Sequence, residues 1–365
     1  MKKRSGSYVK GYVRDEKTFI RNAFRLRMSG LERVRMALAR GSDEEAWEEL
    51  FAYYARRKKP VDPKIAETGR INDRYVQKVA RQVSDNLSAW RIKGEVDWNC
   101  GDNPPRKDWE KYWSRNTLGF LDFWTMAAQV SGRGDIRRGT AKIFLEWYNA
   151  CPAPELPHVA YWDKDTHGFS WREIEVGLRG RMLVTIFLAS RGWTDVPEEF
   201  HRALLISIVQ HVDYLSFYYE RFGFIEGNHQ THHAPAPLAA GYLLPELRKA
   251  KDWSRLGLRI FREHLASDHD EECVQVEHSP GYHVNMFRLY MDAYRIYSQN
   301  GQRGPAWLGR AVNAMADFIM YSVDSAGMMF PINDSRYKLA LPVLREASRL
   351  LGRPELLAPS GRSVK

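Results

Sequence analysis

The sequence has no long hydrophobic run, few cysteines and almost no alternating strand pattern. No apolar stretch approaches the ~20 residues that a membrane-spanning helix needs. Residues 2–4 are basic and lead into polar residues rather than an apolar signal segment. We therefore expect no membrane span and a cytoplasmic location, or a periplasmic or secreted one if the chain is processed. Cys100, Cys151 and Cys273 are too few and too widely spaced for a disulfide framework or a zinc ribbon.

The positive charge is concentrated at the N-terminus. The net charge is +10, and residues 1–60 hold 16 Lys and Arg against 8 Asp and Glu, hence +8, which leaves +2 for the other 305 residues. Such a field attracts polyanions, among them acidic polysaccharides. The alternative is a solvated helix face without a partner. We expect no nucleic-acid partner, because no nucleic-acid-binding motif accompanies the charge.

Hydrophobic and aromatic residues are abundant. The 365 residues are 44% hydrophobic and 13% aromatic, with 12 Trp and 18 Tyr. A chain of this length and composition buries one large core or two ordinary ones, which excludes disorder and fibrous folds. The rings either fill a helical core or line a groove that binds sugars.

Apolar residues recur at helical spacing through most of the chain. Two helices are expected before Pro60, and from Trp109 onward the pattern predicts helices at 116–130, 136–150, 171–191, 197–220, 234–248, 253–268, 281–299, 304–322 and 338–351. We expect an all-α fold in which helical hairpins close into an α/α toroid (an incomplete barrel), with an open helical solenoid as the alternative. The predicted division is a basic helical segment 1–62, a polar linker 63–108, the toroid 109–352 and a tail 353–365.

Two polar loops, each opening a long helix, carry the chemistry. The first, residues 226–237, contains Asn228 and His229 and leads into a helix at Pro235. His229, His232 and His233 have a spacing that can ligate a metal, but the nearby prolines argue against a helix at this point, and we expect no metal ion and no cofactor. The alternative for this loop is a polar structural segment.

The second loop, residues 274–287, contains His278, Tyr282 and His283 around a Pro-Gly pair. A tyrosine at such a helix start can give or take a proton if a nearby cation lowers its pKa from about 10. The alternative is a packing residue at the start of the helix.

Together the two loops resemble those of the heparinase II/III-like and alginate-lyase-like polysaccharide lyases, whose catalytic domain is an α/α toroid. The resemblance covers roughly residues 95–340, and its other parts are Asp97-Trp98, Trp109, Trp113-Ser114-Arg115-Asn116, Gly134-Asp135, Trp147, Cys151-Pro152, 171–181 and 331–336. It implies β-elimination on an acidic, uronate-containing glycan.

The resemblance also implies roles for individual residues. Asn228 matches the group that neutralises the uronate carboxylate, and His229 matches the residue that assists it or acts as base. Tyr282 matches the acid and base that protonates the leaving oxygen. Arg172, Glu175 and Arg179, spaced to share one helix face, form either a substrate-binding wall or a buried ion pair that braces the fold. Further candidates for substrate contacts are Trp171, His233, His278 and His283, the last two with a structural role as the alternative.

Relatives of this type commonly continue into a β-sandwich that covers the cleft and supplies a further histidine. This sequence has no strand-rich region after residue 352. It therefore predicts a toroid that completes its own site, or a partner chain that supplies the missing half, or reduced lyase activity. Two other functions remain open: a non-catalytic glycan-binding or scaffold protein, and a glycoside hydrolase, which needs two suitably spaced carboxylates. The carboxylates available for a hydrolase are Asp163, Asp165, Glu226, Glu277 and Asp334.

Overall fold

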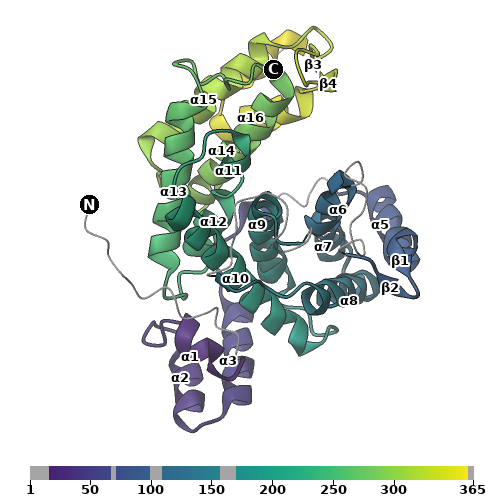
Figure 1. The fold of residues 1–365 in the computed structure, drawn as a ribbon, viewed down its shortest axis with the longest axis vertical. Helices are drawn as coiled ribbons and strands as arrows, with labels where there is room; N and C mark the ends of the chain where they lie inside the picture. Colours follow the sequence, from purple (N-terminus) through teal and green to yellow (C-terminus); the bar gives the residue numbers. More distant parts are fainter. Residues whose placement is uncertain (1–15, 67–70, 99–108, 157–169, 361–365) are drawn as a thin grey trace. The chain divides into compact units, whose positions relative to one another are not determined.

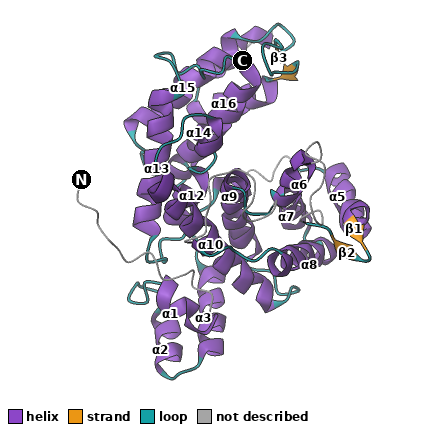
Figure 2. Cartoon of the chain, viewed as in Figure 1, coloured by secondary structure: helices purple, strands orange, loops and turns teal. Residues whose placement is uncertain are grey.

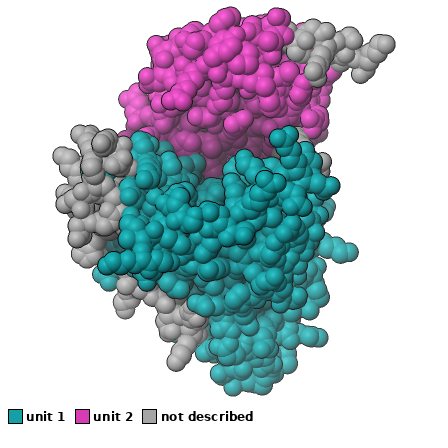
Figure 3. Space-filling model, turned by 90° about the vertical axis from the view of Figure 1, so that its right-hand side faces the viewer, with its two compact units in different colours: residues 1–223, 236–256 teal, residues 224–235, 257–365 magenta. Residues whose placement is uncertain are grey.

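The computed structural model describes residues 16–66, 71–98, 109–156 and 170–360, and its chain is drawn in Figure 1. The chain divides into two compact units (Figure 3): unit 1 comprises residues 1–223 and 236–256, and unit 2 comprises residues 224–235 and 257–365. Asp163 and Asp165 lie outside the described residues. No helix in the described part of the chain is long and apolar enough to cross a membrane.

Unit 1 is built almost wholly from helices (Figure 2). Its elements are α1 (Glu16–Ala23), α2 (Glu32–Ala39), α3 (Asp43–Arg56), α4 (Pro63–Ala66), α5 (Asp73–Asp85), a 3-10 turn (Ser88–Trp90), β1 (Arg91–Ile92), β2 (Glu95–Val96), α6 (Trp109–Asn116), α7 (Gly119–Ser131), α8 (Gly134–Ala150), α9 (Glu173–Ser190), α10 (Glu198–Phe222) and α12 (Pro235–Leu243). Strands β1 and β2 pair as a small antiparallel hairpin.

Helix α9 forms the core of unit 1. Almost every residue from Val176 to Ser190 is buried, and the helix packs against α7 and α10. Gly180 marks a close approach: a Cβ there would lie 2.9 Å from the Cβ of Ala236 and 3.3 Å from that of His211. A larger residue at this position would therefore force α9 away from its neighbours.

The N-terminal helices are joined to the rest of unit 1 by buried ionic contacts. Arg57 Nη1 donates to Glu246 at 2.9 Å, and the hydroxyl groups of Tyr53 and Tyr54 donate to the same carboxylate at 2.7 and 3.2 Å. Arg181 forms a second buried pair with Asp62, with both N–O distances at 2.9 Å. Buried charges are tolerated when they are paired and hydrogen-bonded in this way.

Unit 2 contains a second set of helices and one short hairpin. Its elements are α11 (Asn228–Thr231), most of α13 (Ala250–Ser267), α14 (Pro280–Ser298), α15 (Ala306–Tyr321), β3 (Met328–Met329), β4 (Lys338–Leu339), α16 (Leu341–Leu351) and a 3-10 helix (Pro354–Ser360). Helices α14, α15 and α16 contact one another, and their core includes Phe287, Met315 and Leu344.

The predicted all-α fold is confirmed, because the described residues contain only four strands, each of two residues. The predicted helices at 136–150, 171–191 and 197–220 correspond to α8, α9 and α10 within two residues at each end. The helix predicted at 234–248 ends at Leu243, because Pro245 disfavours helical geometry at the residue before it. The N-terminal region forms three helices rather than two, since residues 24–31 form a turn between α1 and α2.

Candidate active site

The short helix α11, which carries Asn228 and His229, begins at a glycine with an unusual backbone. Gly227 has φ +110° and ψ 163°, a conformation that residues with a Cβ rarely adopt. Its N–H donates to Asp268 Oδ2 at 3.3 Å. The sequence therefore needs glycine at this position to turn the chain into α11.

A buried histidine holds the other side of this turn. His264 Nε2 lies 3.1 Å from Gln230 Oε1, which also accepts a hydrogen bond of 2.8 Å from the N–H of Ile225. His264 Nδ1 lies 2.6 Å from Asp268 Oδ2. Because Gln230 presents its oxygen to Ile225, Nε2 of His264 is the donor to that oxygen. Gly227 and Gln230, on either side of Asn228, are thus both fixed by the end of α13 and the residue that follows it.

The side-chain amide of Asn228 is oriented by a carboxylate from the second loop. Its Nδ2 donates to Glu277 Oε1 at 2.7 Å. Glu277 is held in turn by Gln275, whose Nε2 donates to the same oxygen at 2.8 Å and whose Oε1 accepts from the N–H of Glu277 at 3.0 Å. A hydrogen bond to an ionised acceptor is stronger than one between neutral groups. The amide of Asn228 therefore has a defined direction.

Tyr282 is half-exposed in the first turn of α14, which begins at Pro280 and contacts α11. The loop before it is fixed by the segment after β3. Ser335 Oγ accepts from the N–H of Gly281 at 2.6 Å and lies 2.8 Å from Ser279 Oγ. Asn333 Nδ2 donates to the carbonyl of His278 at 3.0 Å. Segment 331–336, whose resemblance to lyases was noted above, thus contacts the loop that carries Tyr282.

The histidines of the two loops fall into two groups. His229 and His278 are exposed, whereas His233 and His283 are each 1% exposed. Burial lowers the pKa of His233 well below its ordinary value, and burial lowers the pKa of His283 to about 4. His283 Nε2 donates to the carbonyl of Met315 at 3.1 Å. His233 and His283 are therefore neutral near pH 7. Of these four histidines, His229 and His278 are the two that a ligand can reach from the surface.

His232, between these groups, is half-buried, and burial together with the charge of His229 lowers its pKa to about 4. In the described ranges no three His, Cys, Asp or Glu side chains lie close enough together to hold a metal ion.

The residues expected to form a substrate-binding wall belong to unit 1 and contact one another there. Arg172, the N-cap residue of α9, donates to both oxygens of Glu175 at 2.6 and 2.7 Å and lies over the ring of Trp113. Burial raises the pKa of Glu175, and the charge of Arg172 opposes this shift. Trp171 is buried and donates from Nε1 to the carbonyl of Cys151 at 3.0 Å.

Arg179 is 0% exposed, and burial lowers its pKa to about 9. Its Nε donates to His211 Nε2 at 2.7 Å, and its Nη1 and Nη2 donate to the carbonyls of Asn116 and Ser170. Because Arg179 is wholly buried and bonded to groups within the protein, its guanidinium is not accessible to a glycan. These contacts support the alternative in which the cluster braces the fold.

Two features of the site, and one pair of cations elsewhere on unit 2, were not indicated by the sequence. Glu277 was noted only as a carboxylate for a hydrolase, although it orients Asn228. His264 lies in the last turn of α13 and Asp268 directly follows that helix; both are buried, and nothing in the local sequence links them to Gly227. Lys338 lies close to Arg288, and burial followed by this like charge lowers its pKa.

Comparison with known proteins agrees with the resemblance. The family model described as Heparinase II/III N-terminus matches residues 20–350. A heparin-sulfate lyase of Pedobacter heparinus is 26% identical over 285 residues, which are 74% of this chain and 41% of the relative. A heparin-sulfate lyase of Bacteroides stercoris is 23% identical over 314 residues, which are 80% of this chain and 46% of the relative.

Solved structures show the same fold. A structure of heparinase III superimposes with a TM-score of 0.77 at 18% identity, covering 93% of this chain and 54% of that one. The heparan sulfate lyase of Pedobacter heparinus gives a TM-score of 0.72 at 21% identity, covering 96% of this chain and 56% of that one. The likeness confirms the predicted helical toroid. The chain spans about half the length of the relatives it matches.

Proposed function

The chain belongs to the heparinase II/III family, and from this premise we propose that it is the helical part of a polysaccharide lyase acting on an acidic, uronate-containing glycan. The observation that carries the proposal is the fixed amide of Asn228, held by Glu277 at 2.7 Å on a turn that contacts the helix of Tyr282. The curated relatives are heparin-sulfate lyases, so heparan sulfate is the first substrate to test.

In the proposed reaction the base removes the C5 proton of a uronate, and the electron pair forms the C4–C5 double bond as the bond from C4 to the glycosidic oxygen breaks. Negative charge builds on the uronate carboxylate, and a donor aimed at it is most effective in the transition state. Asn228 supplies that donor, with His229 exposed beside it. Tyr282 takes the C5 proton in a syn elimination and returns a proton to the leaving oxygen, so the enzyme ends unchanged.

The product carries an unsaturated uronate that absorbs in the near ultraviolet, so the assay is direct. We expect an absorbance rise with heparan sulfate, its loss in Tyr282→Phe, and a fall of about 10²–10³ in kcat for Asn228→Ala. Tyr321→Phe is the matched control, because Tyr321 is 81% exposed on α15 and outside the two loops.

The proposal fails if a panel of sulfated and unsulfated uronate polymers binds without any chromophore and Tyr282→Phe changes nothing. In that case the non-catalytic glycan-binding alternative replaces it. Release of new reducing ends without the chromophore would instead indicate a hydrolase.

A further inference from the structure

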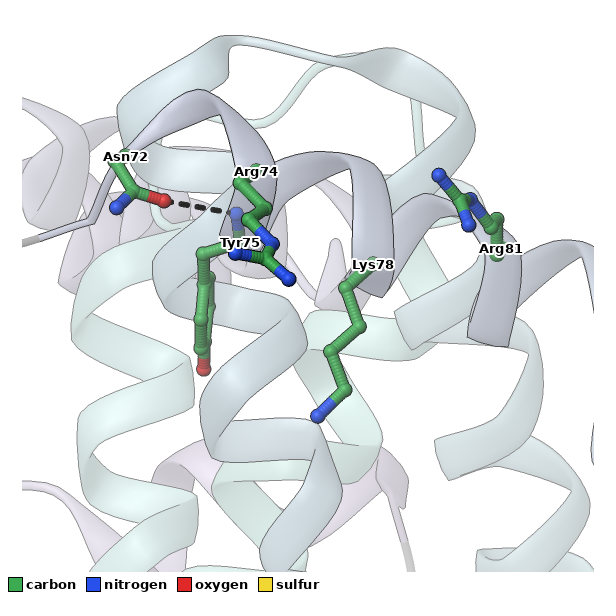
Figure 4. A pocket seen from close by; sticks show the side chains of 5 residues that line it. All are labelled: Asn72, Arg74, Tyr75, Lys78 and Arg81. Carbon is green, nitrogen blue, oxygen red and sulfur yellow. Dashed lines mark hydrogen bonds between the residues drawn. The ribbon is translucent and has the colours of Figure 1, made fainter.

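Helix α5 carries three exposed cations along one side. Arg74, Lys78 and Arg81 are spaced at i, i+4 and i+7, so they recur about once per helical turn of 5.4 Å. Together with Asn72 and Tyr75 they line a pocket of about 420 Å³ (Figure 4). Tyr75 and Lys78 extend in the same direction from the helix in this view, and Arg81 lies further along it.

The positive charge of the three cations is not paired in the described part of the chain. None of them forms an ion pair there, although like charges at i, i+3 and i+4 repel and weaken a helix. A second pocket, lined by Arg138 and Lys142, shows the contrast: these cations lie 3.5 and 3.9 Å from Asp195 and Glu146, which line the same pocket. Of these two pockets, the α5 pocket is therefore the one whose cations are left for an external anion.

The pocket is held in shape by the packing of α5 on unit 1. Val76 and Val79 are buried on the opposite side of the helix, where α5 contacts α7 and α8. Asn72 caps the helix, with Oδ1 accepting from the N–H of Tyr75 at 3.0 Å, so its amide N–H₂ remains a donor. The cations therefore project from a fixed helix.

Aromatic surface lies beside the cations. The ring of Tyr75 meets that of Phe123 edge to face, with centroids 6.4 Å apart, and Phe123 is 57% exposed. Burial and the nearby Asp122 raise the pKa of Tyr75 to about 12, so its hydroxyl stays protonated and can donate. Rings of this kind offer a face for the C–H side of a sugar ring, next to donors for its acidic groups.

We propose that Arg74, Lys78 and Arg81 bind the acidic groups of a sulfated glycan chain, as an accessory site separate from the two loops that hold Asn228 and Tyr282. The assignment of a glycan rests on the proposed function, because cations with aromatic rings also suit single-stranded nucleic acid. A glycan with one acidic group per sugar ring presents charges at a repeat of the same order as the helical turn. The site increases the affinity for long glycan chains and leaves the turnover of short ones unchanged.

The test compares two triple variants that remove the same charge at the same spacing. Arg74→Gln/Lys78→Gln/Arg81→Gln removes the α5 cations, and Arg255→Gln/Arg259→Gln/Arg262→Gln removes three exposed arginines of α13. Two of the control arginines already pair, with Asp252 at 3.0 Å and Glu263 at 2.9 Å. Glutamine is a good helix former, so both variants are expected to keep the wild-type circular dichroism and Tm.

We expect Kd for long heparan sulfate to rise at least tenfold in the α5 variant and less than twofold in the control. The slope of log Kd against log salt should fall by two to three in the α5 variant. Fewer ionic contacts form in this variant, so fewer counterions are released on binding. Turnover of a heparan sulfate tetrasaccharide should stay within twofold of the wild type.

Equal losses in the two variants, or no loss in either, would overturn the inference. So would an oligonucleotide of equal charge that binds as tightly through the same three residues. Binding is measured independently of turnover. If the wild type produces no unsaturated product but the α5 variant alone loses binding, the proposed function is refuted and the α5 site stands. If elimination is normal and the α5 variant binds as tightly as the wild type, the α5 site is refuted and the proposed function stands.

Discussion

Replacing Glu277 by leucine removes the acceptor that orients Asn228 while keeping a side chain of similar size. A hydrogen bond to a charged group contributes about 1.5–3 kcal/mol, and each 1.36 kcal/mol is a factor of ten. The 2.7 Å bond from Asn228 to Glu277 therefore favours one amide orientation about 10–100-fold. If that orientation is the productive one, kcat for elimination falls by about the same factor, less than the loss for Asn228→Ala.

A double-mutant cycle decides whether Glu277 acts through Asn228. On the Asn228→Ala background, Glu277→Leu should leave kcat unchanged, because there is no amide left to orient. Glu277→Gln keeps an acceptor and should recover part of the rate. Glu271→Leu, at an exposed residue of the same connection, is the control and should behave like the wild type. Losses that simply add in the double variant would show that Glu277 has another role, and the orientation argument would be wrong.

Three further substitutions test the fold and the turn. Glu246→Ala should lower the free energy of unfolding by about 3–5 kcal/mol, measured in urea, because it leaves Arg57 buried and unpaired; a loss below 1 kcal/mol would contradict this. The pKa of His283 falls to about 4 on folding, so the unfolded chain binds more protons than the folded chain between about pH 6.5 and 4. The free energy of unfolding should therefore decrease as the pH falls through that range, by up to about 3 kcal/mol. His283→Gln should flatten this part of the urea-derived profile, and an unchanged slope would exclude His283 as its source. Gly227→Ala should cost about 1–3 kcal/mol and reduce turnover, because alanine is strained at φ +110°. Gly192→Ala, with open space around the position and no positive φ, should be nearly neutral in the same assays.

Local patterns predicted most of the helices and missed those with little apolar surface. Helices α8, α9 and α10 have long apolar repeats, and their ends agree with the prediction. Helix α5 was not predicted, because Val76 and Val79 are its only fully buried residues in a mainly polar stretch. The two hairpins were not predicted, because strands of two residues are too short to show an alternation of apolar and polar residues.

For the site, the sequence indicated the two loops but not the contacts between them. Asn228 and Glu277 are 49 residues apart, and no local spacing links an amide to a carboxylate at that distance. The spacing of Arg172, Glu175 and Arg179 correctly predicts ionic contact between the first two. It could not show that Arg179 is wholly buried, because α9 is surrounded on all sides by neighbouring helices.

The bond between Asn228 and Glu277 has a stereochemical consequence. An amide group has two hydrogens, and Glu277 accepts one of them, so the direction of the other is set by the protein before any ligand arrives. Uronates that differ in configuration at C5 present their carboxylates on opposite faces of the sugar ring. A donor with a fixed direction reaches one of these faces better than the other. We therefore expect turnover to distinguish glucuronate from iduronate within the same polymer, and this preference to weaken when Glu277 is replaced.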